Sequence, residues 1–298
     1  MPTLAHITDL HVAPLPPVTW RQIANKRVLG YVSWHRKRKH EHRGEVLDAL
    51  CRDLAQQAPD HVCVTGDVTN LGLAAEYARA PEWFARLGPP ERVSVIRGNH
   101  DAYVAMPHAE TLAHWTPWLA GDDGATAPPT LRRRGAVSLI GVDTALPTPP
   151  FMASGRVGQA QAERLDALLA QEGAAGQVRV VLLHHPPQPG VVGRRKGLHD
   201  APRVRAVLAA RGAELVLHGH MHVPMTAELP GPTGPIPVYG AGSASSAGTG
   251  RMPPAQYHLV TVTQDARGLR LAVTGRRYDS ARAAFGPAPS DAEAPFAA

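Results

Sequence analysis

Cysteines and long hydrophobic runs are both scarce in this chain. Its 298 residues include two cysteines, Cys51 and Cys63, too few for a disulfide framework, which fits a reducing compartment. No stretch approaches the run of about 18 apolar residues that a membrane-spanning helix needs. The N-terminus shows neither the basic segment nor the cleavage site of a signal peptide. With a hydrophobic share of 44%, ample for a buried core, we expect a globular, cytoplasmic protein.

Acidic residues are almost absent from one segment, residues 20–43, which we call the basic insert. It contains eight lysines and arginines against a single acid, Glu41, and so carries a net charge of +7. The whole chain carries +6, so the remaining residues together carry −1. The basicity is therefore a local feature and not a property of the whole surface.

Short runs rich in valine, isoleucine and leucine alternate with helical patterns along most of the chain. The predicted strands are 4–8, 62–65, 93–97, 137–142, 178–183 and 215–217, and the predicted helices are 45–57, 74–87, 159–171 and 203–211. Such alternation predicts an α/β fold, with helices covering parallel strands and ligand groups at the carboxyl ends of the strands.

The pattern changes to strands alone from Met225 onward, over 225–229, 236–239, 257–263 and 269–276, which predicts an antiparallel finish. No repeat or linker divides the chain. We expect one domain over residues 1–286 and a mobile tail over 287–298, where little is available for packing.

Metal-binding side chains cluster in five short motifs that follow predicted strands. The motifs are Asp9-Leu10-His11, Gly66-Asp67, Gly98-Asn99-His100-Asp101, His184-His185-Pro186-Pro187 and Gly219-His220-Met221-His222. Taken singly, the first two are equally typical of surface turns. Two histidines one residue apart after a strand are harder to explain by packing alone, because they present two imidazoles to the same side.

The donor set decides which ions suit these motifs. Carboxylates, imidazoles and one amide, without a thiolate, suit Mn, Fe, Zn or Mg. Seven ligands are too many for one tetrahedral zinc. They indicate two divalent metal ions that share a bridging ligand.

In order and spacing, over residues 3–245, these motifs resemble those of the calcineurin-like metallophosphoesterases. The resemblance implies an α/β fold of the four-layer α+β type, in which two packed mixed β-sheets are flanked by helices. It also implies that the metal site lies on loops at the strand C-terminal ends. It assigns one metal to Asp9, His11, Asp67 and His222, and the other to Asp67, Asn99, His184 and His220, with Asp67 as the bridge.

The same resemblance implies the catalytic groups. His100 is the histidine that protonates the leaving oxygen or stabilises charge on the phosphoryl group, and Asp101 orients it; His185 is left as a packing residue. A metal-bridging hydroxide is the expected nucleophile, because two metals about 3.5 to 4 Å apart activate it and clamp the phosphoryl oxygens. An imidazole acid is useful because a phosphodiester has no easy leaving group.

Differences from the motifs of other branches indicate which branch of the family this chain resembles. The arginine of the serine/threonine protein phosphatases is missing after the second motif, and Asn70 replaces the metal-binding tyrosine of the purple acid phosphatases. The chain is more similar to the bacterial class III cyclic nucleotide and glycerophosphodiester enzymes, which predicts a phosphodiesterase acting on small diesters. Asn70, Arg194 and Arg195 are candidate substrate contacts. Arg132–Arg134 is expected at a solvated hairpin edge.

The basic insert is open to three interpretations. It is a solvated helical hairpin packed on the domain, a lid that offers cations to a substrate phosphate, or an arm that binds an anionic lipid surface through its aromatic and basic residues. In the last case the enzyme is a lipid-directed pyrophosphatase or phosphodiesterase, peripheral at the inner face of the membrane.

Two further functions, a nuclease and a scaffold without activity, are disfavoured by the sequence. A nuclease shares the motifs and would use the insert to follow a phosphate backbone, but the chain lacks an obvious capping domain after the metal core, which disfavours nucleic acid as a partner. A scaffold without activity is disfavoured because all seven ligands are present. The sequence does not indicate an oligomeric state.

Overall fold

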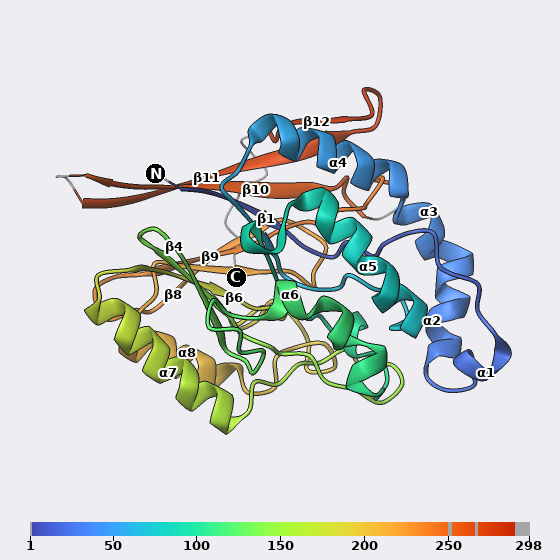
Figure 1. The fold of residues 1–298 in the computed structure, drawn as a ribbon, viewed down its shortest axis with the longest axis horizontal. Helices are drawn as coiled ribbons and strands as arrows, with labels where there is room; N and C mark the ends of the chain where they lie inside the picture. Colours follow the sequence, from blue (N-terminus) through green and yellow to red (C-terminus); the bar gives the residue numbers. More distant parts are fainter. Residues whose placement is uncertain (1, 250–251, 266–267, 290–298) are drawn as a thin grey trace.

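The computed structural model describes residues 2–249, 252–265 and 268–289, which form two six-stranded β-sheets (Figure 1). In spatial order, the first sheet contains β12 (Ala284–Pro287), β11 (Gly268–Asp279), β10 (Gln256–Asp265), β1 (Thr3–Ile7), β2 (His61–Val64) and β3 (Val93–Val95). The second contains β4 (Thr130–Arg134), β5 (Val137–Gly141), β6 (Val178–Leu182), β7 (Leu215–His218), β9 (Ile236–Gly240) and β8 (Met225–Leu229).

Three apolar cores hold four layers together. Leu4 and Val260 of the first sheet share a core with Leu139 and Leu217 of the second. Helices pack on the outer face of each sheet, so central strands such as β1, β2, β5 and β7 are buried on both faces and read as continuous apolar runs. The first sheet is covered by α4 (Gly44–Gln57) and α5 (Ala74–Leu87), and the second by α7 (Gln159–Ala174) and α8 (Ala201–Arg211). The predicted fold of two packed mixed sheets flanked by helices is confirmed.

The five metal-binding motifs follow strands in the parallel part of each sheet. Strands β1, β2 and β3 are parallel neighbours in the first sheet, as are β5, β6, β7 and β9 in the second. Shorter helical turns lie in the connections, at Pro90–Arg92, His100–Ala102, His108–Glu110, Leu112–Trp115 and Thr116–Leu119 (α6). Among the described residues, no helix is both long and apolar enough to cross a membrane.

The C-terminal part differs from the prediction in two ways. The antiparallel finish is right for β8–β9 and β10–β12, but β9 also pairs in parallel with β7. Strand β12 ends at Pro287, the first residue of the predicted tail, and Ala288 N–H donates to Gly275 O at 2.8 Å. Pro287 and Ala288 therefore pack against β11, and residues 290–298 of the predicted tail lie outside the described part of the chain.

Arg132 is also placed differently from the prediction. The segment is indeed an edge strand, β4, paired antiparallel with β5, but the Arg132 side chain is buried and not solvated. Its guanidinium donates to the carbonyls of Ala120, Pro117 and Val93 at 2.6, 2.7 and 2.9 Å. Arg132 thus ties β4 to the turns around β3.

The basic insert forms a helical arm on one side of the molecule (Figure 1). It contains α1 (Trp20–Ile23), α2 (Arg27–Ser33), a π-helical turn (Trp34–Arg38) and α3 (Lys39–Glu41). Buried Arg27 fixes the arm to the loop before α5, because its Nε donates to Leu71 O at 2.9 Å. At the other end, Ala247 N–H donates to Glu41 O at 2.8 Å. The arm is therefore packed on the domain at both ends.

Candidate metal centre

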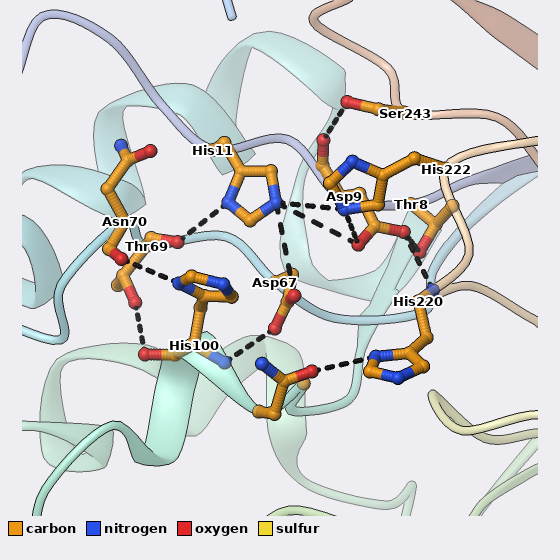
Figure 2. A network of polar contacts seen from close by, with 12 residues as sticks. Thr8, Asp9, His11, Asp67, Thr69, Asn70, His100, His220, His222 and Ser243 are labelled. Atoms are coloured by element: carbon orange, nitrogen blue, oxygen red, sulfur yellow. Dashed lines mark hydrogen bonds and ion pairs between the residues drawn. The ribbon is translucent and has the colours of Figure 1, made fainter. Parts of the chain in front are cut away.

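The five motifs meet where the two sheets end. Three follow β1, β2 and β3 of the first sheet, and two follow β6 and β7 of the second. Backbone hydrogen bonds extend the ladder into the loops: Asp9 N–H donates to Gly66 O at 2.9 Å, and Gly219 N–H donates to His184 O at 3.1 Å. Figure 2 shows side chains of the loops after β1, β2, β3 and β7 converging on one space.

The predicted ligands include several residues with left-handed backbone conformations. Such conformations are uncommon for residues other than glycine and persist where the surroundings impose them, typically at functional sites. The φ angles are 52° at Asp9, 39° at His11, 53° at Asp67, 75° at His220 and 59° at His222. The loops are therefore held in strained conformations that aim these side chains.

The first predicted ligand set is gathered in one place. His222 Nε2 lies 3.0 Å from Asp9 Oδ1 and 3.3 Å from His11 Nε2. His11 Nε2 in turn lies 3.9 Å from Asp67 Oδ2 and 3.9 Å from Asp9 Oδ1. The four donor atoms lie within 4.8 Å of one another, which fits a single metal ion.

The second predicted set lies on the other side of Asp67. His184 Nε2 is 3.4 Å from Asp67 Oδ2 and 3.2 Å from Asn99 Oδ1. His220 Nδ1 is 2.8 Å from the same Asn99 oxygen. The other Asp67 oxygen, Oδ1, accepts a hydrogen bond from the His100 backbone N–H at 2.7 Å. Asp67 Oδ2 is thus left between the two sets, as a bridging ligand requires.

The protonation of the imidazoles fits cations at these positions. His11 Nδ1 lies 3.0 Å from Thr69 O, and a carbonyl only accepts, so the proton is on Nδ1 and the Nε2 lone pair faces the carboxylates. Burial, followed by the charge of Arg38, lowers the pKa of His11 well below its usual value. A neutral imidazole that points a lone pair at two carboxylates needs a cation between them.

His184 leads to the same conclusion by another route. Its Nδ1 lies 2.7 Å from Thr65 O, which leaves Nε2 toward Asp67. Burial is the largest single influence and disfavours the charged ring, but the charge and hydrogen bond of Asp67, the charge of Asp9 and the hydrogen bond to Thr65 O together raise the pKa of His184 to about 9. A proton therefore holds the place of a cation in the metal-free protein, and a metal that binds there displaces that proton.

Two glycines of the motifs allow the close approach of these loops. A Cβ on Gly219 would lie 1.9 Å from Thr8 Oγ1, and one on Gly98 would lie 2.2 Å from Asp67 Oδ1 and 2.4 Å from Asp67 N. All three distances are far below van der Waals contact. Gly98 and Gly219 are therefore needed to bring Asp67 and Asp9 into the site.

Replacing Gly98 with alanine is expected to displace Asp67 and lower stability by about 1 to 3 kcal/mol, the usual cost of overpacking. Thermal unfolding and metal content after dialysis measure the two effects. Gly193→Ala is the matched control, because no atom lies within 4 Å of its added Cβ. If Gly98→Ala and Gly193→Ala have the same metal content and the same thermal unfolding midpoint, this role for Gly98 is contradicted.

His100 stands beside the first ligand set, and its orientation differs in one respect from the prediction. Its Nδ1 lies 2.6 Å from Asn70 O, so a backbone carbonyl holds the ring. The Asp101 carboxylate instead accepts from the backbone N–H groups of Thr69 at 2.8 Å and Gly98 at 2.9 Å. The prediction that Asp101 orients the His100 ring directly is wrong; Asp101 joins the two turns that carry Asp67 and His100.

The environment of His100 and Asp101 shifts the pKa values of both side chains. Burial, and then the charge of Arg38, lowers the pKa of His100 to about 3. Burial, and then the charge of Asp67, raises the pKa of Asp101 to about 7. In the metal-free and substrate-free state the His100 ring is therefore neutral, with its proton on the nitrogen that faces Asn70 O.

None of the three predicted substrate contacts is among the residues that line the cavity, but a neighbouring residue is. Asn70 is buried, and its Nδ2 donates to Val12 O at 2.9 Å. Arg194 and Arg195 are exposed on their loop. The adjacent Lys196 lines the cavity of about 630 Å³ that contains Asp67 and His100. Of the three consecutive cations of this loop, Lys196 is the one that lines the cavity.

Arg38 and His42, both from the basic insert, also enter the site and were not predicted. Arg38 Nη2 lies 2.9 Å from His11 Nδ1, and Nη1 lies 3.3 Å from His100 Nδ1. The His42 ring is buried, with its centroid 4.4 Å from that of His11, and its Nδ1 lies 2.9 Å from Ser245 Oγ. His42, His11 and His222 form a further cluster of possible donors. One signal was available: His42 stands between Glu41 and Arg43 at the end of the basic insert.

His185 has the packing role that was expected for it. It is buried, its Nδ1 lies 2.7 Å from Thr144 Oγ1, and its Nε2 lies 3.2 Å from Ala153 O. Both ring nitrogens are occupied, so His185 supports the loop of His184.

The fold and the site together define a metal-dependent phosphoric ester hydrolase. The model of the calcineurin-like phosphoesterases matches residues 2–224, and the chain belongs to this family. Over 225 residues it is 28% identical to a probable cyclic nucleotide phosphodiesterase of Synechococcus sp., covering 74% of this chain and 73% of that protein.

Solved structures agree on the fold. A dimetal phosphatase from Danio rerio has a TM-score of 0.65 at 13% identity, covering 96% of this chain and 99% of that one. A purple acid phosphatase from yellow lupin has a TM-score of 0.58 at 11% identity, covering 100% of this chain and 57% of that one. At these identities the likeness extends to the fold alone.

Proposed function

We propose that this protein hydrolyses phosphodiesters at a centre of two divalent metal ions held by the two ligand sets that share Asp67. The observation that carries the proposal is the position of Asp67 Oδ2, 3.9 Å from His11 Nε2 and 3.4 Å from His184 Nε2, at a cavity that also contains Arg38 and His100. Mn, Fe, Zn and Mg all suit these donors. When bound, such ions supply Lewis-acid activation of the phosphoryl group and of the attacking water.

The cations of the cavity suit a phosphate group. Lys37 and Arg43 pair with Glu41 and Glu45, but Arg38 has no carboxylate partner in the described part of the chain. Each of its amino nitrogens is nearly equidistant from the two nitrogens of an imidazole, 2.9 and 3.2 Å for His11 and 3.3 and 3.4 Å for His100. The guanidinium therefore rests against the rings, and we infer that its N–H groups bind phosphoryl oxygens.

A diester is favoured over a monoester because the relative from Synechococcus sp. is named as a probable cyclic nucleotide phosphodiesterase. Hydrolysis of an alkyl phosphoester expels an alkoxide, which gains from an acid. His100 lies at the cavity with its Nε2 free of the Asn70 carbonyl and can supply that acid. The negative charge of a bound phosphodiester favours the imidazolium form of His100, which is the form that gives up a proton.

Hydrolysis of bis-p-nitrophenyl phosphate by protein loaded with Mn, Fe, Zn or Mg tests the proposal. We expect turnover that stops on chelation and returns on metal addition. Cyclic nucleotides, glycerophosphodiesters and p-nitrophenyl phosphate, a monoester, then distinguish the substrate classes. Absence of turnover with every divalent ion would refute the function, and a preference for the monoester would refute the diester assignment.

Removing the Arg38 guanidinium is expected to lower kcat/KM for bis-p-nitrophenyl phosphate by about 100-fold, the usual loss for one preorganised donor to a developing charge. Arg38→Lys keeps the charge but loses the planar pair of donors, so we expect only partial rescue. Arg36→Ala, which removes an exposed cation of the same insert, is the matched control. If Arg38→Ala and Arg36→Ala have the same kcat/KM, Arg38 does not bind the phosphoryl group.

A further inference from the structure

Exposed apolar side chains are concentrated beside the metal centre. Trp20 and Phe151 are the most exposed large apolar residues of the described chain, at 71% and 77%. Val28, Leu29 and Val32 of α2 are also exposed, and their i, i+1, i+4 spacing places them on one side of the helix. We call these five residues the apolar rim. Isolated exposed apolar residues are common, but a group of this kind indicates a binding surface.

Two residues of the rim line the metal-centre cavity. Leu29 and Phe151 line the same cavity as Asp67 and His100. Lys26 ties the loop of Phe151 to the insert, because its Nζ donates to Thr148 Oγ1 at 2.6 Å and to Met152 O at 3.1 Å. Exposed apolar side chains from two joined segments therefore belong to the wall of the cavity.

Cations surround the rim, and acids are absent from its vicinity in sequence. No aspartate or glutamate occurs from Trp20 to His40, nor in residues 147–153. Arg21, Arg36, Lys37 and Lys39 are exposed on the insert. The single acid of the insert, Glu41, is buried and lies 3.4 Å from Lys37 Nζ.

The combination of exposed apolar side chains and surrounding cations favours one kind of partner. Nucleic acid is bound by cations and by flat aromatic rings that stack on bases, and three of the five rim residues are aliphatic. An anionic bilayer matches both features, since lysine and arginine bind its head groups while tryptophan, phenylalanine and leucine enter the boundary of the acyl chains.

We propose that the apolar rim and the cations of the basic insert dock on an anionic phospholipid surface, and that the metal centre acts there on a phosphoric ester carrying an apolar chain. The docking stands on the surface alone, whereas the substrate assignment rests on the proposed function. In the reaction, water adds its oxygen to phosphorus, the bond from phosphorus to the leaving oxygen breaks, and that oxygen takes up a proton. The apolar chain stays between Leu29 and Phe151.

Co-sedimentation with vesicles tests the docking. The full-length protein is expected to pellet with vesicles of phosphatidylcholine mixed with phosphatidylglycerol, not with pure phosphatidylcholine, and high salt is expected to weaken the binding. Trp20→Ser with Phe151→Ser is expected to lower the partition coefficient by about tenfold or more, because two aromatic side chains leave the interface. Leu269→Ser is the matched control: Leu269 is 37% exposed on β11, in the hairpin at the opposite end of the molecule from α1 (Figure 1).

The other outcomes each decide a separate point. Equal pelleting with both vesicle types, equal partitioning of the double variant and Leu269→Ser, or no pelleting would overturn the docking. A dimer in sedimentation velocity that the double variant abolishes would show that a second copy covers the rim, and would also overturn it. Asp67→Asn is expected to pellet like the wild type, so docking is measured independently of catalysis.

Product analysis on the same vesicles tests the substrate. Release of a phosphorylated product from phosphatidylglycerol or a lipid-linked pyrophosphate is expected for the wild type, with a several-fold loss for Trp20→Ser, which weakens the docking. Trp20 is not among the residues that line the cavity, so Trp20→Ser and the wild type are expected to hydrolyse bis-p-nitrophenyl phosphate equally. If bis-p-nitrophenyl phosphate is hydrolysed but no lipid is, the apolar-chain assignment falls and the phosphodiesterase proposal stands. If neither is hydrolysed, the phosphodiesterase proposal itself fails.

Discussion

Asp67→Asn is expected to abolish the dinuclear centre and to lower turnover of bis-p-nitrophenyl phosphate by more than about 100-fold. Loss of a residue that merely supports a metal ligand already costs about 10- to 100-fold, and Asp67 is the ligand that both sets share. Its Oδ2 lies 3.9 Å from His11 Nε2 and 3.4 Å from His184 Nε2. An asparagine has one oxygen and no negative charge, so it cannot both accept from His100 N–H and bridge two cations.

Asp67→Asn is expected to change metal binding without changing the fold. An asparagine still accepts the hydrogen bond that His100 N–H makes at 2.7 Å, so the turn between β2 and α5 is expected to keep its shape. We expect two metals per wild-type chain and fewer in the variant by elemental analysis. Added metal should raise the unfolding temperature of the wild type more than that of Asp67→Asn, because only the wild type gains the full binding energy.

Asp48→Asn is the matched control for this experiment. Asp48 is on α4 and pairs with Arg86 at 2.6 Å on the surface. Its loss changes the net charge by the same amount without touching the site. Two bound metals and near-normal turnover in Asp67→Asn would show that Asp67 does not bridge.

The positions of the metal ligands were predictable because the arrangement of parallel strands in each sheet decides where the loops after those strands meet. Parallel strands end at one edge of a sheet, so donors placed after β1, β2 and β3 must meet. The second sheet contributes through β6 and β7 in the same way. The closeness of Gly98 to Asp67 was not predictable, because it depends on how the two loops pack.

The role of Arg38 was not predictable from charge. Eight cations of the insert look alike in the sequence, yet Arg27 and Arg38 turn inward while Arg36 and Lys39 stay exposed. The π-helical turn from Trp34 to Arg38 changes which side of the helix each side chain occupies. Helical spacing of 3.6 residues gives no warning of such a turn.

Asn70 and Asp101 show a second limit of sequence interpretation. Both were chosen for their side chains, but the Asn70 group that contacts His100 is the backbone carbonyl. The Asp101 carboxylate serves backbone N–H groups of Thr69 and Gly98. Every residue carries these backbone groups, so nothing in a motif tells which of them a histidine ring will meet.

His100→Ala is expected to retain both metals and to lower turnover by about 10²- to 10⁴-fold, the range for a lost general acid. His100 belongs to neither ligand set, and its backbone N–H, which holds Asp67 Oδ1, survives the substitution. Metal content and the unfolding temperature are therefore expected to stay near wild type. His114→Ala, an exposed histidine, is the matched control.

The dependence on the leaving group distinguishes the two roles that His100 can have. If His100 protonates the leaving oxygen, the loss is expected to be larger for an alkyl diester, whose alkoxide is a strong base, than for bis-p-nitrophenyl phosphate, whose phenolate leaves without help. If it stabilises charge on the phosphoryl oxygens beside Arg38, the two substrates are expected to lose turnover equally. Normal turnover on both would remove His100 from the mechanism, and loss of metal would instead place it among the ligands.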